Sequence, residues 1–195
     1  MIIKVEISLR GMNTKRRRIF LAFNLPDKVK RQLVKFQEQW SHLPVRWTRE
    51  QNLHITLVFI GYVNDEEMLE ICHLTKEVAK QEKSFEIELN QICYGPLNKQ
   101  ERMIWVMGKK NEFLGQLREK LSGLIENNSH GNWPFRPHIT LARIKQDQWK
   151  QLPEKPIIDK EISLIFSVDS IEVMQSNLSR QGPDYAVLES VELKG

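Results

Sequence analysis

The chain has 195 residues, of which 41% are hydrophobic and 28% charged, and it carries a formal net charge of +4 with a pI near 9.0. This length and apolar content favour one compact domain with a sizeable core over a disordered chain. No apolar run approaches the length of a membrane span, and charged residues within Met1–Ile7 argue against a secretory signal. The two cysteines are too few for a disulfide framework and suit the cytoplasm.

The pattern of apolar residues predicts a mixture of strands and helices along the chain. Helical spacing indicates three amphipathic helices, and Asn64 with Glu67 resembles a capping pair at the start of the second. In chain order, we expect a strand at 18–26, a helix at 27–40, a strand at 52–60 ending at Gly61, a helix at 64–80, strands at 85–94 and 102–108, a helix at 111–127, and strands at 138–141, 161–167, 170–176 and 185–189. This pattern predicts an α+β fold rather than a doubly wound parallel sheet.

The tetrapeptide His-Ile-Thr-Leu occurs twice, at His54–Leu57 and at His138–Leu141. The chain contains only five histidines, so chance explains the repeat poorly. Alternate side chains of a strand share a face, so in each copy His and Thr point one way while Ile and Leu point into a core. Two such pairs facing each other suit a phosphodiester. One imidazole gives a proton, the other takes one, and the threonine hydroxyls hold phosphate oxygens.

Two other interpretations of the tetrads compete with catalysis. A single histidine on a strand is usually a structural residue, but the duplication favours catalysis. A metal site is disfavoured, because two imidazoles fall short of the three protein ligands typical of catalytic zinc and no Asp, Glu or Cys accompanies either copy. We therefore expect neither a metal nor a cofactor.

Paired His-x-Thr-x motifs on strands resemble the signature of the 2H (two-histidine) phosphoesterase superfamily. The stretches Arg18–Pro26, Asn52–Gly61, Arg102–Val106 and Pro137–Arg143 resemble its RNA 2′,3′-cyclic phosphodiesterase branch, also described as 2′-5′ RNA ligases. This resemblance implies a bilobal fold in which two mostly antiparallel sheets face a central cleft, with helices outside. Residues 15–195 would form a single domain, and residues 1–14 an N-terminal extension that is either an added edge strand or an upstream start.

The same resemblance implies roles for individual residues. His54 would be the proton donor to the leaving ribose oxygen, and His138 would be the proton acceptor from water. The phosphate would be bound by Thr56, Thr140 and Arg143. The tetrads are chemically identical, so the residues alone leave the direction of proton transfer open.

Strand parity raises a difficulty for Arg143. In a regular strand this residue would face the Ile139 side, away from His138 and Thr140. We therefore expect the strand to end, or a bulge to fall, near Ala142, so that the guanidinium turns back into the cleft.

Positive charge and aromatic rings near the tetrads suggest contacts with RNA. The candidates are Arg46, Trp133, Phe135 and Arg136. The basic segment Lys15–Arg18 is either a further RNA contact or a solvated arm. Trp105 alternates with Ile104 in a strand and is assigned to the core.

Together the sequence and the resemblance imply a metal-independent RNA 2′,3′-cyclic phosphodiesterase that opens a terminal cyclic phosphate to a 2′-phosphomonoester. It would act on RNA as a cytoplasmic monomer, away from membranes, with an optimum near neutrality because an unperturbed His has a pKa of about 6.5. The reverse 2′-5′ joining reaction is allowed by microscopic reversibility. The alternatives are a 2H enzyme acting on 2′-5′ oligonucleotides or small cyclic nucleotides, and a non-catalytic RNA-binding module.

Overall fold

The computed structural model describes residues 16–97, 99–123, 135–179 and 182–194. The expected N-terminal extension and the end of the third helix lie outside these ranges. In chain order the elements are β1 (Arg17–Asn24), α1 (Asp27–Gln39), β2 (Val45–Trp47), the 3-10 helix η1 (Glu50–Asn52), β3 (His54–Val63), α2 (Asp65–Ala79), β4 (Phe85–Gly95), β5 (Met103–Gly108), α3 (Glu112–Gly123), β6 (His138–Ile144), α4 (Gln146–Lys150), β7 (Asp159–Val168), β8 (Ser170–Ser179) and β9 (Gly182–Glu192).

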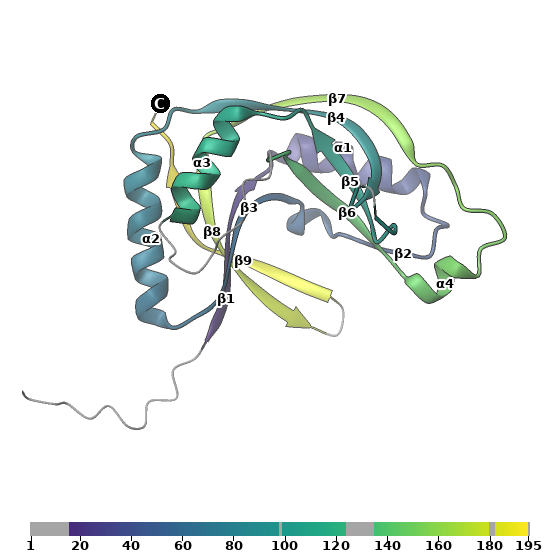
Figure 1. The fold of residues 1–195 in the computed structure, drawn as a ribbon, viewed down its shortest axis with the longest axis horizontal. Helices are drawn as coiled ribbons and strands as arrows, with labels where there is room; N and C mark the ends of the chain where they lie inside the picture. Colours follow the sequence, from purple (N-terminus) through teal and green to yellow (C-terminus); the bar gives the residue numbers. More distant parts are fainter. Residues whose placement is uncertain (1–15, 98, 124–134, 180–181, 195) are drawn as a thin grey trace, which may run out of the picture.

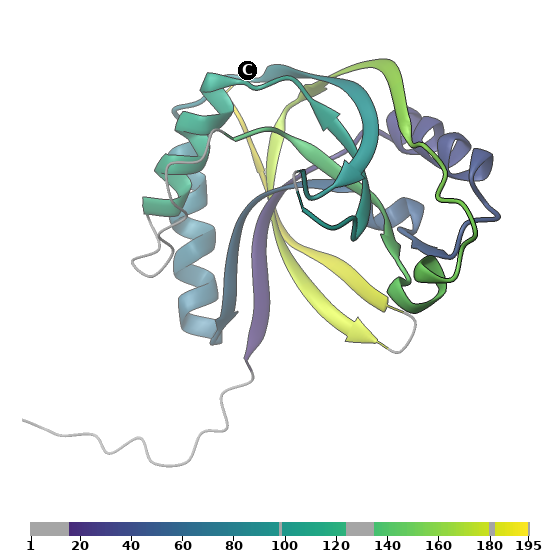
Figure 2. The same cartoon turned by 45° about the vertical axis from the view of Figure 1, so that its right-hand side comes forward.

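The strands form two antiparallel sheets, with the orders β3-β1-β8-β9 and β2-β6-β5-β4-β7. In Figures 1 and 2, α2 and α3 lie together at one side of the molecule, and α1 and α4 lie at the other. The predicted α+β fold with two antiparallel sheets is confirmed. Each sheet contains one tetrad strand, β3 in the first and β6 in the second.

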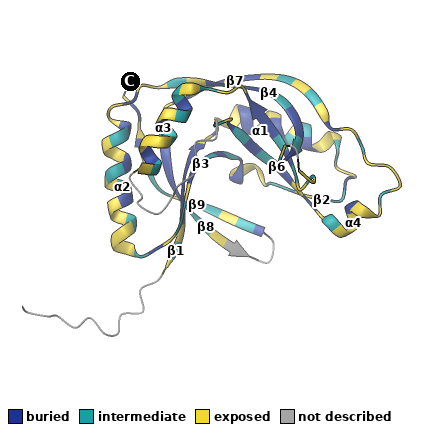
Figure 3. Cartoon of the chain, viewed as in Figure 1, coloured by how far each residue is buried: buried dark blue, intermediate teal, exposed yellow. Residues whose placement is uncertain are grey.

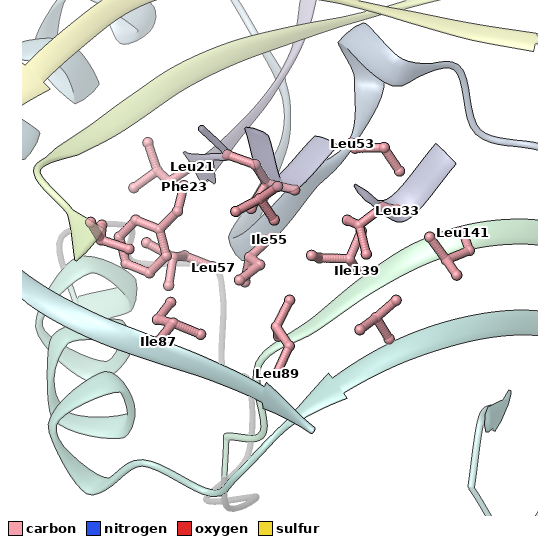
Figure 4. Close-up of a cluster of buried hydrophobic side chains, with 14 of the residues drawn as sticks. Leu21, Phe23, Leu33, Leu53, Ile55, Leu57, Ile87, Leu89, Ile139 and Leu141 are labelled. Atoms are coloured by element: carbon pink, nitrogen blue, oxygen red, sulfur yellow. The ribbon is translucent and has the colours of Figure 1, made fainter. Parts of the chain in front are cut away.

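The apolar halves of the two tetrads share one core. Ile55, Ile139 and Leu141 are fully buried and Leu57 is 3% exposed, and Figure 4 shows all four side chains in one cluster with Leu33 of α1. Burial of each such side chain contributes about 1.5–3 kcal/mol. The shared core fixes both strands so that their His and Thr side chains face the opposite way, as strand parity predicts.

The predicted end of the second strand at Gly61 is wrong, because β3 continues to Val63. Gly61 has φ of 101°, which glycine adopts without a steric penalty. The pairing with β1 also shifts here, from Ile19 opposite Gly61 to Phe20 opposite Phe59. The glycine therefore permits an irregularity within the strand instead of ending it.

The helices follow the predicted ranges closely. Asn64 caps α2, since its side chain accepts a hydrogen bond from the Glu67 amide at 2.9 Å, and the Glu67 carboxylate accepts one from the Asn64 amide at 2.7 Å. The buried residues of α2 are Ile71, Thr75 and Ala79, which share one face, and exposed positions of the helix are visible in Figure 3. No helix in the described part of the chain has both the length and the apolar character that a membrane span requires. The short elements β2 and α4 were not predicted, because three and five residues are too few to show a period.

Candidate active site

The polar faces of both tetrads line one cleft of about 1320 Å³ between the two sheets. His54 and Thr56 reach it from β3, and His138 and Thr140 reach it from β6. The other predicted site residues that line it are Arg46, Phe135, Arg136 and Arg143. Trp133 lies outside the described residues. The fold thus gathers every described member of the predicted set in one place.

A β-bulge occurs at the same position of both tetrads. In β6, Thr140 lies opposite Trp105 and Ala142 opposite Ile104, so Leu141 is the extra residue. The predicted irregularity before Arg143 is therefore confirmed. Because the bulge makes Leu141 and Ala142 both face the core, Arg143 returns to the cleft side.

The corresponding bulge in β3 falls at Leu57, since Val58 pairs with Leu21 and Thr56 pairs with Ala22. Leu57 and Val58 are both buried, and the next residue, Phe59, is 56% exposed and lines the cleft. Phe59 thus occupies in the first tetrad the place that Arg143 occupies in the second, five residues after the histidine.

His54 is held at both ring nitrogens. Its Nδ1 lies 2.7 Å from the backbone carbonyl oxygen of Asn52, which can only accept, so Nδ1 carries a proton. Its Nε2 lies 2.9 Å from the Thr56 hydroxyl. The ring packs at 5.1 Å from the ring of Phe20 and 5.0 Å from that of Tyr185, measured between centroids. These contacts fix both the tautomer and the orientation of the imidazole.

His138 is held less tightly. Its Nδ1 lies 3.3 Å from the backbone carbonyl oxygen of Arg136. Among the described residues, no partner lies within hydrogen-bond distance of Nε2, and Thr140 contacts Met103 Sδ at 4.0 Å instead of the imidazole. The ring of Trp105 lies 4.3 Å from the His138 ring with the planes tilted by 35°. Trp105 is thus a half-buried cleft residue beside His138, and its assignment to the core is wrong in this respect.

Both histidines titrate below their ordinary range. Burial lowers the pKa of His54 to about 4; the Asn52 carbonyl opposes this shift, and the charges of His138 and Lys30 add to it. Burial also lowers the pKa of His138, again opposed by its backbone hydrogen bond to Arg136. An anionic phosphate between the rings would favour their protonated forms and raise both pKa values.

Asn52 is a site residue that the sequence did not reveal. It is 4% exposed, and its backbone carbonyl orients His54. Its side-chain amide donates to the backbone carbonyl of Pro183 in β9 at 2.9 Å, and its buried Oδ1 has no hydrogen-bond partner in the described part of the chain. Asn52 therefore connects the His54 imidazole to β9, the strand that carries Tyr185. No periodicity in the sequence signals this contact between residues 131 positions apart.

The cleft is strongly basic. Its cationic residues are Arg18, Arg46, Arg49, Lys110, Arg118, Arg136 and Arg143, whereas none of the described residues that line it is acidic. Burial raises the pKa of Tyr185 above its ordinary value, and three of these arginines, Arg143, Arg18 and Arg46, oppose that shift. Within the described ranges, no three or more His, Cys, Asp or Glu side chains are grouped as a metal site would require. The site therefore combines two imidazoles with positive charge, which suits acid–base chemistry on an anionic ester.

Comparison with known proteins places this geometry among phosphoesterases. A sequence model described as LigT-like phosphoesterase matches residues 23–105. The RNA 2′,3′-cyclic phosphodiesterase of Methanocaldococcus jannaschii is 31% identical over 176 residues, covering 88% of this chain and 98% of that protein. The enzyme of the same name from Thermotoga maritima is 30% identical, covering 91% and 96%. The crystal structure of TT0787 of Thermus thermophilus superposes with a TM-score of 0.79 at 28% identity, covering 91% and 98%.

Proposed function

The chain belongs to the LigT-like phosphoesterase family, and from this we propose that it is a metal-independent RNA 2′,3′-cyclic phosphodiesterase. The substrate is RNA that ends in a 2′,3′-cyclic phosphate, and the product is a 2′-phosphomonoester. The observation that carries the proposal is the pair of bulged tetrads. They aim two imidazoles, two threonine hydroxyls and Arg143 into one cleft that has no acidic residue among its described lining.

His138 acts as the base in this proposal, and His54 acts as the acid. His138 Nε2 takes a proton from water while the water oxygen bonds to phosphorus. The bond from phosphorus to O3′ then breaks, and His54 Nε2 gives its proton to O3′, which leaves the phosphate on O2′. Two features support this direction. No described residue lies within hydrogen-bond distance of His138 Nε2, so this nitrogen is free to accept a proton from water, whereas the Thr56 hydroxyl orients Nε2 of His54.

The phosphate is held by Thr56, Thr140 and Arg143 in this proposal. A guanidinium presents a planar fork of donors that matches two phosphate oxygens, and it stays charged at every working pH. Arg143 is the one of the three that only the second tetrad possesses. Its charge would stabilise the pentacoordinate phosphorus as negative charge builds on the equatorial oxygens.

The extent of positive charge favours a polynucleotide over a small cyclic nucleotide. Arg46 and Arg143 are paired neighbours on β2 and β6. At the other end of β6, Arg118 lies against Phe135, and Lys110 follows Gly108, whose amide bonds the Pro137 carbonyl. Cations at both ends of the cleft would contact phosphates beyond the reacting one. We further propose that the protein acts as a monomer in the cytoplasm. The whole site comes from one chain, and both cysteines are free thiols.

The decisive experiment is hydrolysis of a short RNA with a 2′,3′-cyclic end in excess chelator, followed by identification of the phosphate position. The proposal expects full activity and a 2′-phosphate. Loss of activity in chelator would contradict metal independence, and a 3′-phosphate would contradict the assignment of O3′ as the leaving atom. An RNA that binds but is not turned over would indicate a binding module instead.

A further inference from the structure

Arg118 is a cation of the cleft that hydrolysis at the histidines does not use. It projects from α3, is half-buried, and lines the cleft together with Phe135. Its guanidinium carbon lies 5.3 Å from the centre of the Phe135 ring. Its Nε is buried without a hydrogen-bond partner in the described ranges, and no described carboxylate lies within ion-pair distance.

A partly buried guanidinium without an anionic partner is unfavourable, because it has lost water and gained no counter-charge. Burial accordingly lowers the pKa of Arg118, although Glu119 opposes the shift. Stacking on a ring holds the plane of the guanidinium while leaving its edge free to donate. A planar donor edge facing an acid-free cleft is the arrangement that recognises phosphate.

The surroundings of Arg118 add further positive charge. Lys110 and Arg136 line the same cleft, and Arg136 directly follows Phe135 in the chain. The Gly108 amide donates a hydrogen bond to the Pro137 carbonyl at 2.8 Å. This bond holds the chain just before Lys110 next to the chain just before His138. The adjacent Lys109 behaves differently: it pairs with Glu88 at 2.9 Å and does not line this cleft.

This basic end is separate from the phosphate between the histidines. Arg118 reaches the cleft beside Phe135, which lies before the start of β6, whereas Arg143 lies toward the other end of that strand, after His138. Arg118 and Arg143 therefore serve different phosphates.

We propose that Arg118, held against Phe135, binds the first internucleotide phosphate of an RNA segment that enters with a free 5′-hydroxyl on the His138 side. This inference rests on the proposed function, in which His138 faces the incoming nucleophile. The 5′-hydroxyl of the bound segment lies where water would otherwise attack. The subsite binds the RNA segment that supplies the 5′-hydroxyl. It is distinct from the contacts that hold the other segment, which ends in the cyclic phosphate.

Calorimetric titration tests this without requiring turnover. The protein is first saturated with adenosine 2′-monophosphate, which fills the space between the histidines, and is then titrated with the 5′-hydroxyl dinucleotide ApA or with adenosine. ApA is expected to bind more tightly than adenosine, because only ApA carries an internucleotide phosphate. Arg118→Met should weaken ApA binding by about tenfold or more, the range of a charge-assisted hydrogen bond, with little change for adenosine.

Two further variants make the result specific. Arg118→Lys retains the charge without the planar fork and should give an intermediate affinity for ApA. Lys109→Gln removes a neighbouring charge outside the cleft and should leave ApA binding unchanged. Equal weakening of ApA and adenosine by Arg118→Met would show a purely structural role and overturn the proposal, as would unchanged ApA affinity. Hydrolysis of the cyclic-phosphate RNA, assayed separately, shows whether the proposed function itself fails.

Discussion

The two tetrad strands carry the same four residues and the same bulge, yet the positions around them differ. Five residues after the histidine, β3 presents Phe59 to the cleft and β6 presents Arg143. β3 is the outer strand of its described sheet, whereas β6 is flanked by β2, which brings Arg46 opposite Arg143. The repeated motif thus places equivalent imidazoles, and the neighbouring strands make the two halves of the site chemically unequal.

The two histidines differ in the same sense. His54 is fastened at both nitrogens and packed between two aromatic rings, whereas His138 is anchored at Nδ1 by a longer bond and stacked on one ring. A fixed imidazole suits delivery of a proton to one oxygen, and an open one suits capture of a proton from a mobile water. Neighbouring residues thus give identical motifs different hydrogen bonds and ring contacts, and this difference is the basis of the distinct roles proposed for the two histidines.

The largest effect should come from removing either imidazole. His54→Ala and His138→Ala should each lower kcat/KM for the cyclic-phosphate RNA by about 10²–10⁴-fold, the scale of general acid or base catalysis. The pH profiles of kcat/KM should also distinguish the two variants. His138→Ala, which lacks the proposed base, should lose the acidic limb, and His54→Ala, which lacks the proposed acid, should lose the alkaline limb. Near-wild-type turnover by either variant would remove the basis of the comparison.

Much of this site could be predicted because strand parity is a local rule. The facing of His54, Thr56, Ile55 and their counterparts follows from alternation, and the parity conflict at Arg143 required an irregularity where Leu141 bulges. The matching bulge at Leu57 was missed, because Phe59 is apolar and no function demanded that it face the cleft.

Contacts made by distant segments could not be predicted in the same way. Trp105 alternates with core residues, and only the pairing of β5 with β6 places its ring on His138. Tyr185 and Asn52 meet His54 from segments whose approach depends on the whole fold. No pattern in the sequence distinguishes Arg118, since exposed and cleft-facing cations give the same helical pattern.

The second largest effect should distinguish Arg143 from Phe59. Arg143→Ala should lower kcat/KM by about 10²–10³-fold, as expected when a preorganised donor to a developing oxyanion is lost. Phe59→Ala should cost less than about tenfold, because a ring offers no donor. Arg143 is exposed, so Arg143→Ala should leave the thermal unfolding temperature unchanged. Equal losses at the two positions would mean that phosphate binding is shared by the halves.

A smaller effect is expected at Asn52, which supports only the His54 half. Asn52→Ala removes the 2.9 Å hydrogen bond that the Asn52 amide donates to the Pro183 carbonyl. The lost bond corresponds to about 0.5–1.5 kcal/mol, so kcat/KM should fall by up to about tenfold as Tyr185 loosens beside His54. Asn177 is an exposed residue of β8, the strand that pairs with β9. Asn177→Ala is therefore the control, and its kcat/KM should match that of the wild type. A KM increase with constant kcat would instead place Asn52 in substrate binding.

The smallest effect is a displacement of the pH optimum, and its direction follows from both histidines. Productive hydrolysis needs one imidazole protonated and the other neutral, so kcat/KM peaks between the two pKa values of the free enzyme. Burial lowers the pKa of His54 to about 4 and lowers that of His138 below its ordinary value. Above both values the required proton is lost, and below both the base is blocked, so the optimum of kcat/KM should lie below pH 6.5 rather than near neutrality.

The optimum of kcat should lie at higher pH than that of kcat/KM, because kcat reports the enzyme with its substrate bound and the phosphate anion raises both pKa values. Rates measured from pH 4 to 9 at constant ionic strength would provide both profiles. Arg143→Ala offers a control, since it leaves the burial of the imidazoles in the free enzyme intact and should leave the kcat/KM optimum acidic. A kcat/KM optimum at or above pH 7 would show that the free histidines are not desolvated as the cleft implies, and the distinction between a fixed acid and an open base would then need another cause.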